Sequence, residues 1–276
     1  MTERPPQEPI EAQLEAIRKE VTCHPRLSLA VPLDRSSDIV KEMEHDHAYL
    51  AQTLSLFGAS PFSTKQYNFG TIRYSRRDGN CFYRCAGFRL CELIAENPSR
   101  ADEYVALLKS REAILSQLFG PFVLEFTAAL EEIFSGVADK TITDVAQVYN
   151  YFISDDSGYV VAALRYFLSA YLQEHEADYE PFVEGLGYGT VRDYCNAEVE
   201  VVDHESDNVQ VAAFAKAFNI CIIVYALDRN AGTNITEYSF NEESSRRNPS
   251  LVVRLLYMPG HFNLLGGDAD GGKGVS

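Results

Sequence analysis

The chain has 276 residues, 46% of them hydrophobic, which is enough to build one large domain or two small ones around a substantial core. Acidic residues outnumber basic ones by 40 to 24, and the net charge of −16 argues against a nucleic-acid-binding protein, because such proteins normally present a basic face. The charge suits a partner with a basic feature, although an acidic surface that only aids solubility explains it equally well.

The cysteines and the apolar runs limit the chemistry and the cellular setting. The six cysteines show neither the spacing of a secreted disulfide framework nor that of paired Cys-x-x-Cys zinc sites, and we expect no metal and no cofactor. The N-terminus is polar and does not resemble a signal peptide, and no run approaches the ~20 apolar residues of a membrane span. These features predict a protein of the reducing cytoplasm, with the nucleus as a second setting, and no membrane partner.

The N-terminal part is expected to form a disordered start followed by a helical arm. Residues 1–8 are rich in proline and glutamate, a composition typical of disorder. Residues 9–57 carry two periodic apolar patterns that indicate helices, and the second of these starts after Asp38 and ends at Gly58. The first helix is marked by Ile10, Leu14, Ile17 and Val21.

A turn followed by a cysteine lies near the start of the main domain, which we place at residues 58–265. Residues 58–80 are expected to be an aromatic-containing loop, and its last part is the turn-forming run Asp78-Gly79-Asn80. Cys81 follows at once and opens an apolar, helix-compatible segment. This segment should stop at Asn97, because the residue before a proline disfavours helical geometry.

Cys81 is therefore predicted to lie at the N-terminus of a helix. The unpaired N–H groups there and the positive end of the dipole favour a thiolate over a thiol, so that such cysteines can titrate below the free value of ~8.5. The same N–H groups could hold a developing oxyanion, and Gly79 allows the positive φ and close backbone approach that such a turn needs. The alternative is an ordinary buried cysteine that acts as a small apolar residue.

The rest of the chain predicts a helical layer followed by a sheet. Apolar periodicity predicts helices near residues 104–118, 122–134, 142–149, 159–173 and 208–218. Ser154 to Ser157 should cap the 159–173 helix. Strands are expected at 220–225, 236–240, 251–258 and 261–265, and the Gly/Asp-rich residues 266–276 should be disordered. The result is one α+β domain in which the helical layer packs on a small C-terminal sheet.

The last predicted strand carries a histidine and an amide on one face. Strand alternation places His261 and Asn263 on the same side, directly after the Pro259-Gly260 turn. A cysteine, a histidine and an amide or carboxylate are the parts of a thiol-protease triad, and these parts often lie far apart in sequence. Cys81, His261 and Asn263 are therefore the candidate catalytic residues.

Two motifs resemble those of a known family. Asp78-Gly79-Asn80-Cys81-Phe82-Tyr83-Arg84 and Pro259-Gly260-His261-Phe262-Asn263 look like the active-site pair of the otubains, which are ovarian-tumour-domain (OTU) cysteine proteases that cleave ubiquitin. The likeness extends over about residues 68 to 265. Further similar runs are Tyr171-Leu172-Gln173, Phe182-Val183-Glu184-Gly185, residues 191–199 and Glu205-Ser206-Asp207.

The resemblance implies a papain-like OTU fold and a deubiquitinating thiol protease that hydrolyses the isopeptide bond at the C-terminal glycine of ubiquitin. In that mechanism Cys81 attacks the carbonyl, His261 stabilises the thiolate and then protonates the leaving lysine amine, and Asn263 orients the imidazole. The backbone amides of the turn would form the oxyanion hole, and Asp78 would shape this loop. A preference for the polyubiquitin linkage that signals degradation is also implied.

The resemblance further implies that the partners are ubiquitin, polyubiquitin chains and ubiquitin-conjugating (E2) enzymes. Ubiquitin contacts are expected near the site and on the arm, at Glu205, Asp207, Asn208, Gln210, Phe262, Ile10, Leu14 and Ile17. Two alternatives stay open. One is a regulator that binds ubiquitin and E2 enzymes without catalysis, and the other is a protease for another modifier that ends in Gly-Gly.

Overall fold

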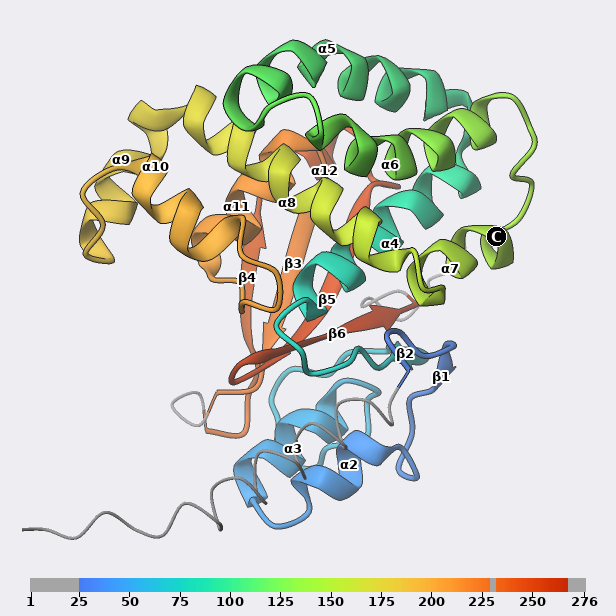
Figure 1. Cartoon of the computed structure of the whole chain (residues 1–276). Helices are drawn as coiled ribbons and strands as arrows, with labels where there is room; N and C mark the ends of the chain where they lie inside the picture. Colours follow the sequence, from blue (N-terminus) through green and yellow to red (C-terminus); the bar gives the residue numbers. More distant parts are fainter. Residues whose placement is uncertain (1–24, 229–231, 268–276) are drawn as a thin grey trace, which may run out of the picture.

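The computed structural model describes residues 25–228 and 232–267. Residues 1–8 and the first helix of the expected arm, with its ubiquitin-contact candidates Ile10, Leu14 and Ile17, lie outside the described residues, as does the tail from residue 268. Within the described parts, a six-stranded sheet has helices on both faces, which confirms the predicted α+β class (Figure 1).

The sheet has the strand order β1-β2-β6-β5-β3-β4. Neighbouring strands are antiparallel, except that β3 and β5 run parallel. In β5, Val253 and Leu255 belong to the core on one face and Leu256 and Met258 to the core on the other, which explains why this strand is almost continuously apolar. The strands are β1 (Val31–Pro32), β2 (Thr71–Arg73), β3 (Cys221–Ala226), β4 (Thr236–Phe240), β5 (Val252–Met258) and β6 (His261–Gly266).

A layer of helices covers one face of the sheet and encloses the main core (Figure 1). Its longer members are α4 (Cys81–Glu96), α5 (Ala101–Phe119), α6 (Val123–Ala138), α7 (Val145–Ile153), α8 (Ser157–Glu174), α9 (Glu176–Gly185) and α11 (Asn208–Ala217). The short helical elements are the 3-10 turn η1 (Pro98–Arg100), α10 (Val191–Tyr194), the π-helix η2 (Cys195–Val199) and, beside β3, α12 (Glu242–Arg247).

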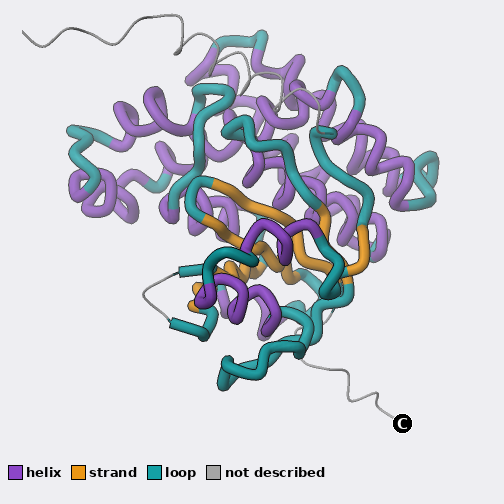
Figure 2. The backbone as a smooth tube through the Cα atoms, turned by 90° about the horizontal axis from the view of Figure 1, so that it is seen from below, coloured by secondary structure: helices purple, strands orange, loops and turns teal. Residues whose placement is uncertain are grey.

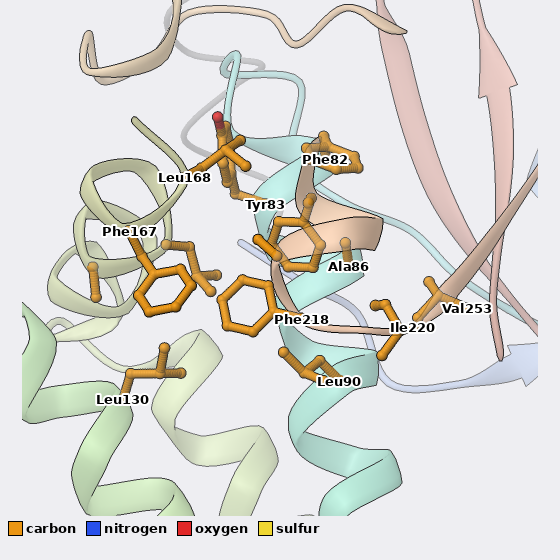
Figure 3. Close-up of a cluster of buried hydrophobic side chains, with 14 of the residues drawn as sticks. Phe82, Tyr83, Ala86, Leu90, Leu130, Phe167, Leu168, Phe218, Ile220 and Val253 are labelled. Atoms are coloured by element: carbon orange, nitrogen blue, oxygen red, sulfur yellow. The ribbon is translucent and has the colours of Figure 1, made fainter. Parts of the chain in front are cut away.

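Helix α4 lies inside this layer and forms a rigid support for Cys81. Phe82, Ala86 and Leu90 of α4 are completely buried, in a cluster with Phe167 of α8 and residues of β5 (Figure 3). A Cβ at Gly87 would lie 2.4 Å from Leu164 Cδ1, so this glycine lets α4 and α8 approach closely. Cys81 is therefore fixed at the end of a tightly packed helix.

The other face of the sheet is covered by α2 (Asp38–Met43) and α3 (His47–Ser55), which lie in front of the strands in Figure 2. Ile39 and Leu54 share a second apolar cluster with Leu256 and Leu265. Strand β1 also pairs with β2. The described part of the expected arm is thus packed against the same sheet that carries His261.

Several details differ from the sequence prediction. The single helix expected after Asp38 is two helices, because the Asp46 carboxylate accepts hydrogen bonds from the N–H groups of Ala48 and Tyr49 and so caps a new helix, α3. The cap expected before α8 is also incomplete, since the Asp156 side chain makes no capping hydrogen bond.

Two expected irregular segments contain strands. The 58–80 loop includes β2, and Gly266, which was expected to begin the disordered tail, ends β6 and pairs with Thr71. Strands of two or three residues are too short to show a periodic pattern, so β1 and β2 could not be recognised. In the parts of the chain that are described, no helix has the length and apolar character to cross a bilayer.

Candidate active site

The candidate nucleophile opens α4, as predicted. The turn before it is closed by Asp78, whose Oδ1 accepts a hydrogen bond from the Asn80 N–H at 3.1 Å. The same carboxylate binds both terminal nitrogens of Arg84 at 2.6 and 2.5 Å, one helical turn after the nucleophile. Asp78 thus ties the turn to α4, which is the loop-shaping role expected for it.

Gly79 is required by both its conformation and its surroundings. Its φ is +78°, and a Cβ at this position would lie 2.2 Å from the Asp203 carbonyl oxygen. Asn80 is buried and binds the same neighbour, since its Nδ2 donates to Asp203 Oδ1 at 2.6 Å. The turn therefore packs directly against the chain after η2, and any side chain at Gly79 would force the two apart.

His261 and Asn263 come together on β6, as the alternation predicted. His261 Nε2 lies 3.1 Å from Asn263 Oδ1, and that oxygen also accepts a hydrogen bond from the Ser75 N–H at 3.0 Å. Because the Ser75 N–H can only donate, it fixes which amide atom faces the imidazole, and Nε2 must then carry the imidazole proton. His261 Nδ1 keeps the lone pair, as a general base requires.

The structure brings the strand that carries His261 against Cys81. The N–H of Phe262 donates to Cys81 Sγ at 3.4 Å, and Cys85 Sγ, one helical turn later, donates to the Phe262 carbonyl at 3.7 Å. His261 Nδ1 is buried and has no hydrogen-bond partner among the described residues. The free base nitrogen and the thiol therefore lie on neighbouring elements, which the backbone of Phe262 joins through its contacts with Cys81 and Cys85.

Burial sets the protonation state of both groups. It raises the pKa of the Cys81 thiol, although the N–H groups of Phe262 and Phe82 act in the opposite direction. It also lowers the pKa of His261 to about 4, helped by the charge of Arg77 and opposed by the hydrogen bond with Asn263. The expectation that the helix N-terminus favours a thiolate at Cys81 is wrong for this conformation, because Cys81 is only 2% exposed and its desolvation outweighs the hydrogen bonds from these N–H groups.

The expected ubiquitin contacts near the site differ in how exposed they are. Glu205 and Asn208 are exposed. Gln210 is fully buried and accepts a hydrogen bond from Tyr83 Oη at 2.7 Å, and Phe262 is buried. The partly buried Asp207 uses its Oδ1 to cap α11, through the N–H groups of residues 209 and 210. Gln210 and Phe262 are thus inaccessible to a partner in this conformation, which corrects the expectation of a direct contact.

Sequence reasoning missed two residues that shape the site. Ser75 lies in the stretch expected to be a loop, and its use of a backbone N–H leaves no signal in the sequence. Arg165 lies on α8, is fully buried and donates to Asn80 Oδ1 at 2.8 Å. A single charge within an otherwise apolar helical run was the signal that could have pointed to it. Among the described residues, no cluster of three or more His, Cys, Asp or Glu has the geometry to hold a metal.

Sequence comparison relates this chain to known proteins. A family model described as Peptidase C65 Otubain matches residues 20–267. The ubiquitin thioesterase OTUB1 of Homo sapiens is 33% identical over 263 residues, which cover 94% of this chain and 89% of that protein. The ubiquitin thioesterase otubain-like protein of Caenorhabditis briggsae is 32% identical over 210 residues, covering 71% of this chain and 69% of that protein.

Solved structures show the same architecture. A chain from the complex of h/ceOTUB1 with ubiquitin aldehyde and UBC13~Ub matches with a TM-score of 0.77 and 25% identity, over 94% of this chain and 98% of that one. A chain from the complex of ceOTUB1 with ubiquitin aldehyde and UBC13~Ub also matches with a TM-score of 0.77 and 25% identity, over 92% of this chain and 98% of that one. The chain therefore belongs to the otubain family of C65 cysteine peptidases.

Proposed function

We propose that this protein is a deubiquitinating thiol protease that hydrolyses the isopeptide bond at the C-terminal glycine of ubiquitin. The observation that carries the proposal is the arrangement of Cys81 at the start of α4 against β6, where Asn263 leaves the imidazole of His261 with a free Nδ1. The names of the otubain relatives support the choice of ubiquitin as the substrate.

The reaction begins when Cys81 Sγ attacks the carbonyl carbon of the terminal glycine and its proton passes to His261 Nδ1. The resulting oxyanion is held by backbone N–H groups of the turn. Within the described chain, no hydrogen bond engages the N–H groups of Gly79 and Cys81, whereas the Asn80 N–H is committed to Asp78. Gly79 and Cys81 are therefore the oxyanion donors in this mechanism.

His261 then protonates the leaving lysine amine, and a thioester remains between Cys81 and ubiquitin. Water attacks this thioester with His261 again as the base, and the thiol is restored. Because Cys81 and His261 are 2% and 3% exposed, substrate binding must first open the contact between the turn and β6. The binding energy of ubiquitin's globular body, far from the bond that is cleaved, can drive this opening.

The surroundings of the site suit a ubiquitin tail. Asp203 and Glu205 are exposed beside the two catalytic turns, and a Cβ at Gly260 would lie 3.1 Å from Glu205 Oε1. Carboxylates at this position would attract the arginines that precede the terminal Gly-Gly of ubiquitin. We also propose a preference for the polyubiquitin linkage that signals degradation, which cleavage of a panel of diubiquitins with different linkages would test.

A second candidate function is the binding of E2 enzymes charged with ubiquitin. It is favoured by the match over 94% of this chain to an otubain that was solved in complex with UBC13~Ub. The two functions are compatible, because binding of a conjugate does not require the thiol. A Cys81→Ala variant that still binds an E2–ubiquitin conjugate, but no longer cleaves diubiquitin, would separate them.

The proposed catalytic function is tested by covalent capture. Ubiquitin with a C-terminal electrophile should form an adduct on Cys81 and on no other cysteine, as located by mass spectrometry. Cys85→Ala is the matched control, one helical turn further along α4, and should still be labelled. An adduct on Cys85 or Cys221 in the folded protein would contradict the assignment. Faster labelling by another modifier that ends in Gly-Gly would contradict ubiquitin as the preferred substrate.

A further inference from the structure

Arg165 is a charged side chain enclosed in the main core. It lies on α8 and is fully buried, and its guanidinium lies over the ring of Tyr83, 4.3 Å from the ring centroid. Taking such a charge out of water costs several kcal/mol unless hydrogen bonds compensate it. The groups that accept hydrogen bonds from Arg165 therefore indicate what the residue does.

The acceptors belong to two segments that meet at the active site. Nη2 donates to Gly79 O at 3.1 Å and to Asn80 Oδ1 at 2.8 Å, both in the nucleophile turn, which we define as residues 78–80. Nη1 donates to Val199 O at 3.0 Å, and Nη2 also donates to His204 O at 2.8 Å. These two carbonyls belong to the facing segment, which we define as residues 199–205.

The facing segment touches both catalytic turns. Asp203 forms two hydrogen bonds with the Asn80 side chain, at 2.6 and 3.1 Å, and its carbonyl closes the space above Gly79. The carboxylate of Glu205, two residues later, packs against Gly260, the residue before His261. Arg165 thus lies at the junction that holds the nucleophile turn to its neighbour.

We propose that Arg165 is a positioning residue, which holds the nucleophile turn in the conformation that presents the N–H groups of Gly79 and Cys81 to the oxyanion. It acts through Gly79 O and Asn80 Oδ1 and touches no reacting atom. The planar guanidinium matches this task, because one group can reach all four acceptors in a fixed geometry, which the single ammonium of lysine cannot do. The inference rests on the proposed acyl-transfer function.

The test compares two reactions of the same thiol with the same ubiquitin. Hydrolysis of a ubiquitin C-terminal ester passes through an oxyanion, whereas alkylation by ubiquitin with a C-terminal bromoethylamide is a direct displacement at a saturated carbon and forms none. Arg165→Lys should lower kcat for the ester by about 10²-fold, the effect expected of a small misplacement of catalytic groups. KM for the ester and the alkylation rate should stay within about threefold of the wild type, since ubiquitin binding and the thiol are unchanged.

Arg111→Lys is the matched control. Arg111 lies on α5 and also contacts α8, through an ion pair with Glu174, and not the nucleophile turn. It should leave both reactions unchanged. Thermal unfolding monitors the fold of each variant, and Asp203→Gly provides a second test if Arg165→Lys does not fold. This substitution removes the carboxylate that binds Asn80 at an exposed position whose φ of +63° suits glycine. It should lower kcat for the ester and leave the alkylation rate at saturating reagent unchanged, so that any weaker binding of the ubiquitin tail is seen only in KM.

The outcomes are distinct. Selective loss of ester hydrolysis supports the proposal. Equal loss of both reactions in folded variants, or no loss in either, overturns it. A wild-type protein that is inert toward both reagents would overturn the proposed function itself, and with it this role of Arg165.

Discussion

Asn263 determines, at the scale of single residues, which nitrogen of His261 acts as the base. Its Oδ1 accepts one hydrogen bond from the Ser75 N–H and one from the imidazole, so its orientation is fixed by the backbone of the chain before the nucleophile turn. A neutral amide can hold the tautomer in this way but cannot add the Coulombic stabilisation of an imidazolium that a carboxylate gives.

Substitutions of Asn263 should separate these two effects. Asn263→Ala should lower kcat/KM by about 10²–10⁴-fold, because the imidazole loses its fixed tautomer and orientation. Asn263→Asp should keep substantial activity, because a carboxylate oxygen can accept the same two hydrogen bonds. It should also move the acidic limb of the pH–rate profile upward, since the added charge raises the pKa of His261, which must be unprotonated to act as the base. A folded Asn263→Ala protein with full activity would remove Asn263 from the mechanism.

His261 should also couple stability to pH. Its pKa is about 4 in the folded chain and about 6.5 when unfolded, so the unfolded chain binds more protons between these values. The free energy of unfolding should therefore fall as the pH drops from 6.5 to 4, by up to about 1.4 kcal/mol per pH unit from this residue alone.

The measurement is urea unfolding of the wild type and of His261→Asn at several pH values. The variant lacks the titrating group, so the difference in unfolding free energy between the two proteins should change across this window and be constant above it. Parallel pH dependences would mean that the imidazole titrates similarly in the folded and unfolded chains.

Among the secondary-structure elements, β6 and α4 together define the site. Strand β6 lies between β2 and β5, and His261 and Asn263 pair with Met258 and Leu256 of β5. Helix α4 is held by its contact with α8 at Gly87. The alternation of β6 and the turn before α4 are local patterns, and for this reason both elements and the triad candidates could be predicted from the sequence.

What the sequence did not reveal depends on tertiary contacts. Burial raises the pKa of Cys81, whereas its position at a helix N-terminus alone predicted a lowered pKa. Gln210 occupies an early position of α11, where an exposed side chain was expected, but it is covered because Tyr83 donates to it. Ser75 acts through its backbone N–H, and Arg165 acts through hydrogen bonds to residues more than 30 positions away in the sequence. Neither role produces a local sequence pattern that could be recognised.

At the scale of the whole molecule, the sheet has a core on each face, and the second core depends on residues 25–57. Removing residues 1–24 deletes none of the described elements. If that segment binds the ubiquitin on the lysine side of the bond, its removal should raise KM for diubiquitin by about tenfold, a loss of ~1.4 kcal/mol, and leave hydrolysis of a ubiquitin C-terminal ester nearly intact.

Steady-state kinetics on both substrates check this expectation. Removing residues 1–57 is the contrasting control, because it also deletes β1, α2 and α3 and uncovers Leu256 and Leu265, and this protein should fail to fold. Equal loss of activity on both substrates after removal of residues 1–24 would show that the segment supports the structure and not binding.

A protonated thiol that is 2% exposed is a poor target for small reactive compounds. Fragments that carry only a reactive group would meet a closed site, and increasing their reactivity would mainly increase reaction with exposed cysteines of other proteins. A selective inhibitor of this enzyme should therefore derive its affinity from groups that mimic the ubiquitin tail and open the contact between α4 and β6. A weakly reactive electrophile attached to such a compound would then be sufficient to modify Cys81.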